Sequence, residues 1–263
     1  MHNWTHVYMP YCDGGSFTGA ASGSFQGSPL TFAGLAIREQ TVAVLRASFG
    51  YDGATDVVVG GASAGGIAAY LHCDFYLAAA PAGARGACLP DSGFFLDGDN
   101  DRDGKGDYDS NMQSLYGFMA SVRGIYSTAC TAAHGYKCLF ADTLLPYIAT
   151  PVFALNSAYD ATMGNGECGA GSGLVMNWSS PAAVNACGAH VRALMRVVLG
   201  GPRNAVFLDS CKHHCGEWGA IHIDGLNCAD AMARWYAGGP GVLPGGGFMD
   251  QAQPYPCASC CSN

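Results

Sequence analysis

Three residues with the chemistry of a serine hydrolase occur in order along the chain. Residues 61–65 read Gly-Ala-Ser-Ala-Gly, a G-x-S-x-G pattern centred on Ser63. This pattern places a serine on a sharp turn between a strand and a helix, where its flanking residues must be small. A serine hydroxyl is a poor nucleophile at neutral pH, so it needs a histidine base and an acid that orients the base. Asp160 and His214, each just past a later β-rich run, fit these two roles.

Two neighbouring residues are rivals for these roles. His213 adjoins His214, but on a loop its side chain is expected to point elsewhere. Asp209 lies closer to the end of the run 205–208, where a carboxylate is expected to cap or bond the backbone. The other histidines have no such placement, and most are expected at the surface or the core edge: His2, His6, His72, His134, His190 and His222. The predicted catalytic residues are therefore Ser63, Asp160 and His214.

The elements that must position these residues follow one pattern. Three short runs, at 56–59, 151–155 and 205–208, are rich in apolar and β-branched residues and lead into polar or glycine turns. Helical patterns occur after the first run and at 33–48 and 184–199. Strands that alternate with helices predict an α/β fold, in which helices cover both faces of a mostly parallel sheet. No internal repeat or linker divides the chain, so residues 1–263 are interpreted as one domain.

The composition excludes several classes of protein. The 263 residues are 49% hydrophobic and 12% charged, which is enough apolar material for a large core and excludes disorder for most of the chain. A net charge of −8 with only 12 Lys and Arg argues against nucleic-acid binding. No run of 18 apolar residues occurs, so no membrane span is expected. The acidic segment 98–109 and the Gly/Pro/Cys-rich tail 238–263 are predicted to be loops.

The 13 cysteines favour an oxidising compartment. Cys257, Cys260 and Cys261 cluster in the tail, while Cys211 and Cys215 flank the histidine pair. A zinc site is the alternative, but no paired C-x₂-C frame supports it, so disulfides are expected. The odd count leaves one thiol free, or its partner is absent from this chain. Two sequons, at Asn3 and Asn177, fit a secreted protein. Residues 1–4 lack the features of a signal peptide, so we expect that Met1 is not the true start.

Six ordered blocks resemble those of the pectin acetylesterase family, whose animal relative is the deacylase Notum. They are Y-C-D-G-G-S-F-T-G (11–19), G-A-S-A-G-G with L-H-C-D (61–66 and 71–74), D-S-G-F-F-L-D (91–97), N-S-A-Y-D (156–160), S-C-K-H-H-C (210–215) and Y-P-C-A-S-C (255–260). The matches run from residue 4 to residue 260. The histidine block is similar to the family's S-C-x-x-H-C, which selects His214 over His213.

The resemblance implies an extracellular or cell-wall α/β-hydrolase that removes acetyl groups from an esterified polysaccharide such as pectin, without a cofactor or a metal. Members of this family normally carry a secretion signal and a G-G-G-W-C-type turn before the block at 11–19. This chain begins after that turn, so the first strands of the sheet are expected to be missing. Of the oxyanion-hole donors, the amide of Ala64 remains.

Other interpretations stay open. The acidic segment resembles the start of a calcium loop, with Asp99, Asp101, Asp103 and Asp107 as ligands, but Ser110 stands where an EF-hand has its glutamate, so a solvated loop is favoured. A Notum-like deacylase of a lipidated protein and a catalytically weak glycan-binding relative are the alternative functions. The acyl chain, the sugar backbone, the disulfide pairing and the oligomeric state cannot be derived from the sequence.

Overall fold

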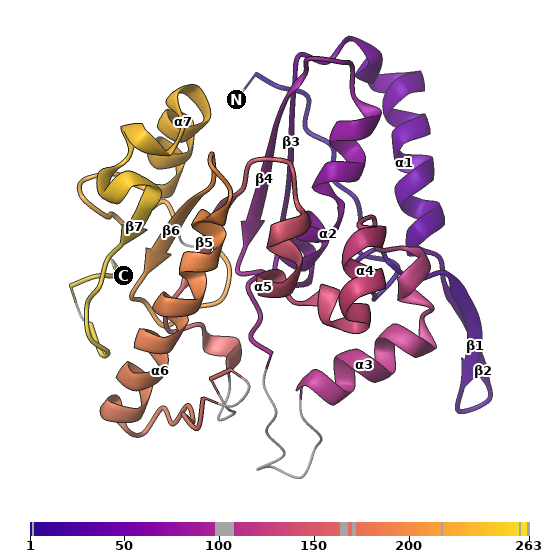
Figure 1. The fold of residues 1–263 in the computed structure, drawn as a ribbon. Helices are drawn as coiled ribbons and strands as arrows, with labels where there is room; N and C mark the ends of the chain where they lie inside the picture. The colour runs from indigo at the N-terminus through magenta and orange to yellow at the C-terminus, as the bar shows by residue number, and fades with distance from the viewer. Residues whose placement is uncertain are drawn as a thin grey trace.

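A computed structural model describes the protein at residue 1 and at residues 3–97, 108–163, 168–169, 172–216, 218–257 and 259–261. Its centre is a parallel sheet with the strand order β3-β4-β5-β6-β7 (Figure 1). The strands are β3 (Asp56–Ala62), β4 (Arg85–Asp91), β5 (Phe153–Ser157), β6 (Ala205–Asp209) and β7 (Phe248–Asp250). Because all five run in one direction, their carboxyl ends lie at one edge of the sheet, where α/β proteins bind ligands.

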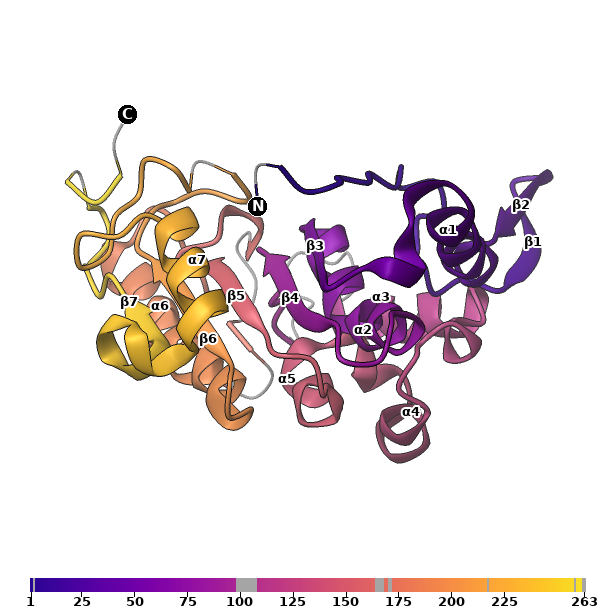
Figure 2. The same ribbon diagram turned by 90° about the horizontal axis from the view of Figure 1, so that it is seen from above.

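Helices cover both faces of this sheet, which confirms the predicted α/β fold (Figure 2). Side chains alternate along each strand: Phe153 and Phe207 pack on the face covered by α7, whereas Ala154 and Leu208 pack on the face covered by α2, α5 and α6. The helices are α1 (Gly34–Phe49), α2 (Ala64–Ala79), α3 (Tyr108–Phe118), α4 (Thr128–His134), α5 (Ala141–Leu144), α6 (Pro181–Met195) and α7 (Cys228–Gly238).

The strands differ in how deeply they are buried. Every residue of β5 and β6 is buried, as expected of apolar strands covered on both faces. Within the described part of the chain, β3 pairs with β4 alone, so it is an edge strand, and its residues are half-buried or exposed. The strand that leads to Ser63 therefore lies at the side of the sheet.

Several elements were not predicted. Strand β4 carries Gly86 and Pro90, which hide its β pattern. A hairpin of β1 (Ala21–Phe25) and β2 (Ser28–Phe32) extends from the body of the protein (Figure 1). The prediction that the tail from residue 238 is all loop is wrong, because β7 lies in it and pairs with β6 through Val206 and Phe248. The calcium candidates Asp99, Asp101, Asp103 and Asp107 lie outside the described residues.

One segment, Pro181–Gly200, is long and apolar enough to cross a membrane by length and composition, with a mean hydropathy of 1.2. It comprises α6 and the 3₁₀ turn that follows. Val184, Val191 and Met195 form its buried stripe, and Arg192 forms an ion pair with Asp250 at 3.1 Å. Here the segment packs as an amphipathic helix against the sheet.

Ten of the 13 cysteines form disulfides, as the sequence predicted for most of them. The pairs are Cys73–Cys88, Cys130–Cys138, Cys168–Cys187, Cys211–Cys261 and Cys257–Cys260. Cys12, Cys215 and Cys228 are free, which corrects the expectation of a single unpaired thiol. The tail cluster is thus joined to the loop after β6.

Candidate active site

Ser63 stands alone on the turn between β3 and α2. Its backbone has φ 58° and ψ −120°, a conformation that costs a non-glycine residue roughly 1–3 kcal/mol and so must be held by its surroundings. A β-carbon at position 61 would lie 2.3 Å from the carbonyl oxygen of Gly65, so only glycine fits there. The first glycine of the G-x-S-x-G pattern thus has a steric cause, since the strand and the helix approach too closely here for a side chain. The second, Gly65, has open space around its β-carbon position.

The loop after β4 supports this turn from the side. The backbone N–H of Ser63 donates to the carbonyl oxygen of Asp91 at 2.9 Å. Such contact requires that α2 approach the loop closely: a β-carbon on Gly66 would lie 2.6 Å from that same carbonyl oxygen. The turn that carries Ser63 is therefore fixed by backbone contacts to a second strand end.

The structure brings Ser63, His214 and Asp160 together in one hydrogen-bonded chain. The distance from Ser63 Oγ to His214 Nε2 is 2.7 Å, and Nδ1 of the same ring lies 2.9 Å from each carboxylate oxygen of Asp160. The three residues follow the ends of β3, β6 and β5. Side chains that are far apart in sequence meet here because these strands end at the same edge of the sheet.

Burial and hydrogen-bond partners define where the proton lies in the hydrogen-bonded series Ser63–His214–Asp160. Asp160 is only 4% exposed, and its Oδ1 also accepts bonds from the backbone N–H and the hydroxyl of Thr162. A carboxylate accepts bonds and does not donate them, so the His214 proton resides on Nδ1 and the Nε2 lone pair faces the Ser63 hydroxyl. This arrangement can remove a proton from Ser63.

The two rival residues pair with each other instead. His213 Nε2 lies 2.9 Å from Oδ2 of Asp209, and the ring packs edge-on against Trp218. Oδ1 of Asp209 accepts the backbone N–H of Cys211, as expected of a carboxylate that bonds the backbone. Burial raises the pKa of Asp209. Adjacent histidines thus point to separate aspartates, and His214 is the one that reaches Ser63.

The histidine loop is anchored at both ends. The backbone N–H of Cys215 donates to Ser92 Oγ at 3.0 Å, and the hydroxyl of Ser157 donates to the carbonyl oxygen of Cys211. The Cys211–Cys261 disulfide attaches the same loop to the chain's last described residues. The sequence pattern predicted no role for Ser92, although this residue lies in the D-S-G-F-F-L-D block at 91–97.

The profile of the family described as pectinacetylesterase matches residues 1–262. The chain belongs to this family. Among its relatives are three proteins of Arabidopsis thaliana: pectin acetylesterase 7 and pectin acetylesterase 5, each 28% identical, and pectin acetylesterase 11, 27% identical. The alignments cover 90%, 99% and 90% of this chain but 66%, 64% and 65% of the relatives. The chain therefore spans just under two thirds of the length of these relatives.

Two aromatic residues lie beside His214. The ring of Phe95 lies edge-on to His214 at a centroid distance of 6.0 Å and stacks on Tyr108 at 5.6 Å. Burial raises the pKa of Tyr108, so its hydroxyl stays neutral. Sequence reasoning assigned no role to either residue. Phe95 lies in the block at 91–97, whereas Tyr108 lies outside the six blocks and contacts Phe95 only in the folded protein.

Two of the three free thiols, Cys215 and Cys228, do not compete with Ser63 as nucleophiles. Burial and the carboxylate of Asp91 raise the pKa of Cys215, and burial raises that of Cys228 to about 11. Both therefore remain thiols at neutral pH, whereas the thiolate is the reactive form. Within the described ranges, no group of three or more His, Cys, Asp or Glu side chains could hold a metal ion.

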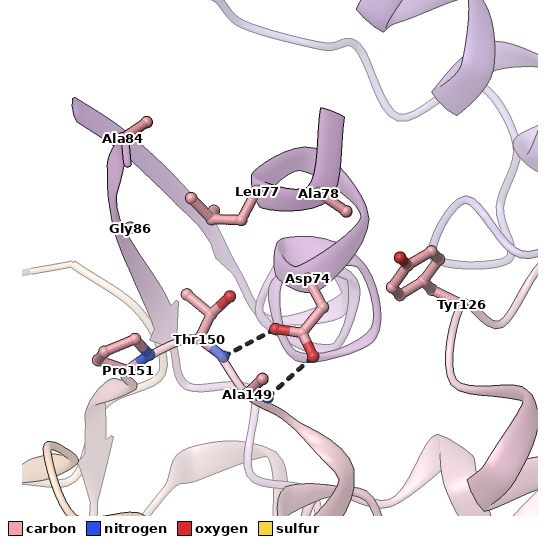
Figure 3. A pocket seen from close by; sticks show the side chains of 9 residues that line it. All are labelled: Asp74, Leu77, Ala78, Ala84, Gly86, Tyr126, Ala149, Thr150 and Pro151. Atoms are coloured by element: carbon pink, nitrogen blue, oxygen red, sulfur yellow. Dashed lines mark hydrogen bonds between the residues drawn. The ribbon is translucent and has the colours of Figure 1, made fainter. Parts of the chain in front are cut away.

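A separate cavity of about 420 Å³ lies at the amino ends of β4 and β5 (Figure 3). Ser63 follows the carboxyl end of β3, so the cavity is at the opposite edge of the sheet. It is lined by Asp74, Leu77, Ala78, Ala84, Gly86, Tyr126, Ala149, Thr150 and Pro151. The carboxylate of Asp74 already accepts the backbone N–H groups of Ala149 and Thr150, at 2.9 and 2.8 Å. Asp74 therefore ties α2 to the segment before β5, and the cavity does not adjoin the candidate active site.

Proposed function

We propose that this chain is a serine carboxylesterase that removes acetyl groups from an esterified cell-wall polysaccharide such as pectin. The hydrogen-bonded chain Ser63–His214–Asp160 carries the proposal, since it contains a nucleophile, a base and an orienting acid in reach of one another. The relatives named pectin acetylesterases supply the substrate class. No cofactor is required for this chemistry.

In the first half-reaction, Ser63 Oγ attacks the carbonyl carbon of the acetyl ester while His214 Nε2 accepts its proton. The negative charge that develops on the carbonyl oxygen needs a donor, and the N–H of Ala64, the first residue of α2, is suited to this role because helix N-terminal amides lack partners within the helix. His214 then protonates the departing sugar oxygen. The sugar hydroxyl leaves, and an acetyl group remains on Ser63.

In the second half-reaction, His214 takes a proton from a water molecule whose oxygen attacks the acetyl-serine carbonyl. Collapse of the intermediate returns the proton to Ser63 Oγ and releases acetate. Asp160 orients the ring of His214 and stabilises the imidazolium that forms twice in the cycle. Each half-reaction thus uses Ser63, His214, Asp160 and the N–H of Ala64.

The disulfides support a location outside the cytosol, because five bridges form and persist in an oxidising compartment. The sequon residues Asn3 and Asn177 are both exposed, as acceptors of a glycan must be. We therefore assign the protein to the extracellular space or the cell wall.

The decisive experiment combines a fluorophosphonate probe with acetate release from acetylated pectin. The unchanged protein should be labelled and should release acetate, while Ser63→Ala should do neither. A protein that binds pectin but resists the probe would be the glycan-binding relative. A series of aryl esters from acetyl to palmitoyl addresses the Notum-like alternative, which requires faster turnover of the long chains.

A further inference from the structure

A buried polar cluster adjoins the turn that carries Ser63, and the catalytic steps above do not use it. The Ser16 hydroxyl donates to the carbonyl oxygen of Ala64 at 2.9 Å. Its backbone N–H donates to the hydroxyl of Tyr11, also at 2.9 Å, and its carbonyl oxygen lies 2.8 Å from His72 Nε2. All three polar groups of Ser16 are therefore engaged, and one of them reaches the residue that follows Ser63.

His72 and Arg38 hold Ser16 from behind. His72 is 2% exposed, and since its Nε2–H donates to Ser16, its Nδ1 lone pair accepts from Arg38 Nη1 at 3.2 Å. Arg38 is buried as well, donates to the carbonyl oxygen of Gly124 and lies over the ring of Phe75 at 4.3 Å. Burial and the charge of Arg38 lower the pKa of His72 to about 3, so the ring is neutral and keeps this tautomer.

The turn that presents Ser16 is itself fixed. The backbone of Ser16 has φ 51° and that of Phe17 has φ 58°, which strains two successive non-glycine residues. Asp13, 4% exposed, accepts the N–H of Gly34 at the start of α1 at 2.7 Å and the N–H of Gly15 at 3.1 Å. A carboxylate at a helix N-terminus is stabilising, so α1 anchors the turn against α2.

This cluster is a costly way to stabilise a fold. Burying charged and polar groups carries a desolvation penalty, and apolar residues of similar volume often give equal or greater stability. What the cluster provides is a fixed position for the Ala64 carbonyl. Because the C=O and N–H of Ala64 belong to one residue, holding the carbonyl restricts the rotation that would move the N–H.

We propose that Ser16 is a positioning residue for the oxyanion-binding N–H of Ala64, and that His72 and Arg38 hold Ser16 in place for this purpose. The inference rests on the proposed esterase function. Removing a direct oxyanion donor costs roughly 10²–10³ in rate. Loosening that donor should cost less, so the loss of the Ser16 hydroxyl is expected to lower kcat about tenfold and to leave KM within about twofold, because the oxyanion exists only in the transition state.

The test compares Ser16→Gly and Ser16→Ala with the unchanged protein in aryl acetate hydrolysis and in the rate of fluorophosphonate labelling. Glycine accepts φ 51° without strain, so Ser16→Gly removes the hydroxyl and leaves the turn its conformation. His72→Gln keeps a donor for Ser16 and an acceptor for Arg38, and it should retain most of the activity, whereas His72→Leu should resemble the Ser16 variants. Asn227→Ala is the matched control, since it removes one side-chain bond to the backbone at the start of α7.

The expected result is a parallel fall of kcat and labelling rate, about tenfold, in both Ser16 variants, with normal values in Asn227→Ala. If the unchanged protein is labelled and both Ser16 variants keep kcat and labelling rate within twofold of its values, this inference is wrong and the proposed function stands. If the unchanged protein is not labelled at all, Ser63 is not an activated nucleophile, and both proposals are overturned.

Discussion

If the proposed esterase function holds, replacement of Asp160 by asparagine should sharply lower kcat by reversing the tautomer of His214. Oδ1 of Asp160 accepts two bonds from Thr162, at 2.8 and 2.7 Å, and both donors stay in place after the change. They hold the oxygen of the new amide, so its NH₂ group takes the Oδ2 position, 2.9 Å from His214 Nδ1. An amide donor there favours an unprotonated Nδ1, which moves the proton to Nε2 and removes the base that Ser63 needs.

The expected loss is about 10⁴ in kcat, or roughly 5 kcal/mol of transition-state stabilisation, as for other triads with the wrong tautomer. The assay is aryl acetate hydrolysis, with the melting temperature as a check on folding. Asp209→Asn is the matched control, because it places the same amide beside the adjacent histidine, His213, which does not reach Ser63. A loss of less than tenfold in Asp160→Asn, or equal losses in the two variants, would refute this reasoning.

Three further outcomes concern stability. Gly66→Ala places a β-carbon 2.6 Å from a backbone oxygen and should lower the free energy of unfolding in urea by roughly 1–3 kcal/mol. Gly65→Ala, with open space around its β-carbon, should leave it unchanged, and equal effects of the two changes would contradict this. Since the pKa of His72 is lowered from 6.5 to about 3, its contribution to stability is complete above pH 6.5 and should fall by about 1.4 kcal/mol per pH unit as the pH drops towards 3. His72→Gln should flatten that slope in unfolding measured from pH 6 to pH 4, and an unchanged slope would assign it to other groups. The Cys211–Cys261 bridge closes a sequence separation of 50 residues, so opening it with a double serine variant should cost about 4 kcal/mol, and non-reducing peptide mapping should recover this pair.

The sequence predicted the parts of the site that depend on local chemistry. The small residues around Ser63 and the polar residues after β5 and β6 are local signals, and parallel strands bring such ends to one edge of the sheet. Partners that meet only through the fold were not predictable: Tyr108 stacks on Phe95, and Ser16 reaches Ala64 across 48 positions. Strand β7 was missed for a similar reason, since its three residues become a strand only by pairing with β6.

The spacing of the triad along the chain has a consequence for folding. Its hydrogen bonds join Ser63 to His214 across 151 positions and Asp160 to His214 across 54. Such distant contacts form only after long loops have closed, and parallel strand pairing is slow for the same reason. The hydrogen-bonded arrangement around Ser63 is therefore expected to assemble late, when β3, β5 and β6 already lie side by side. During refolding, we expect phosphonate reactivity to report the finished sheet and the helical signal to return earlier.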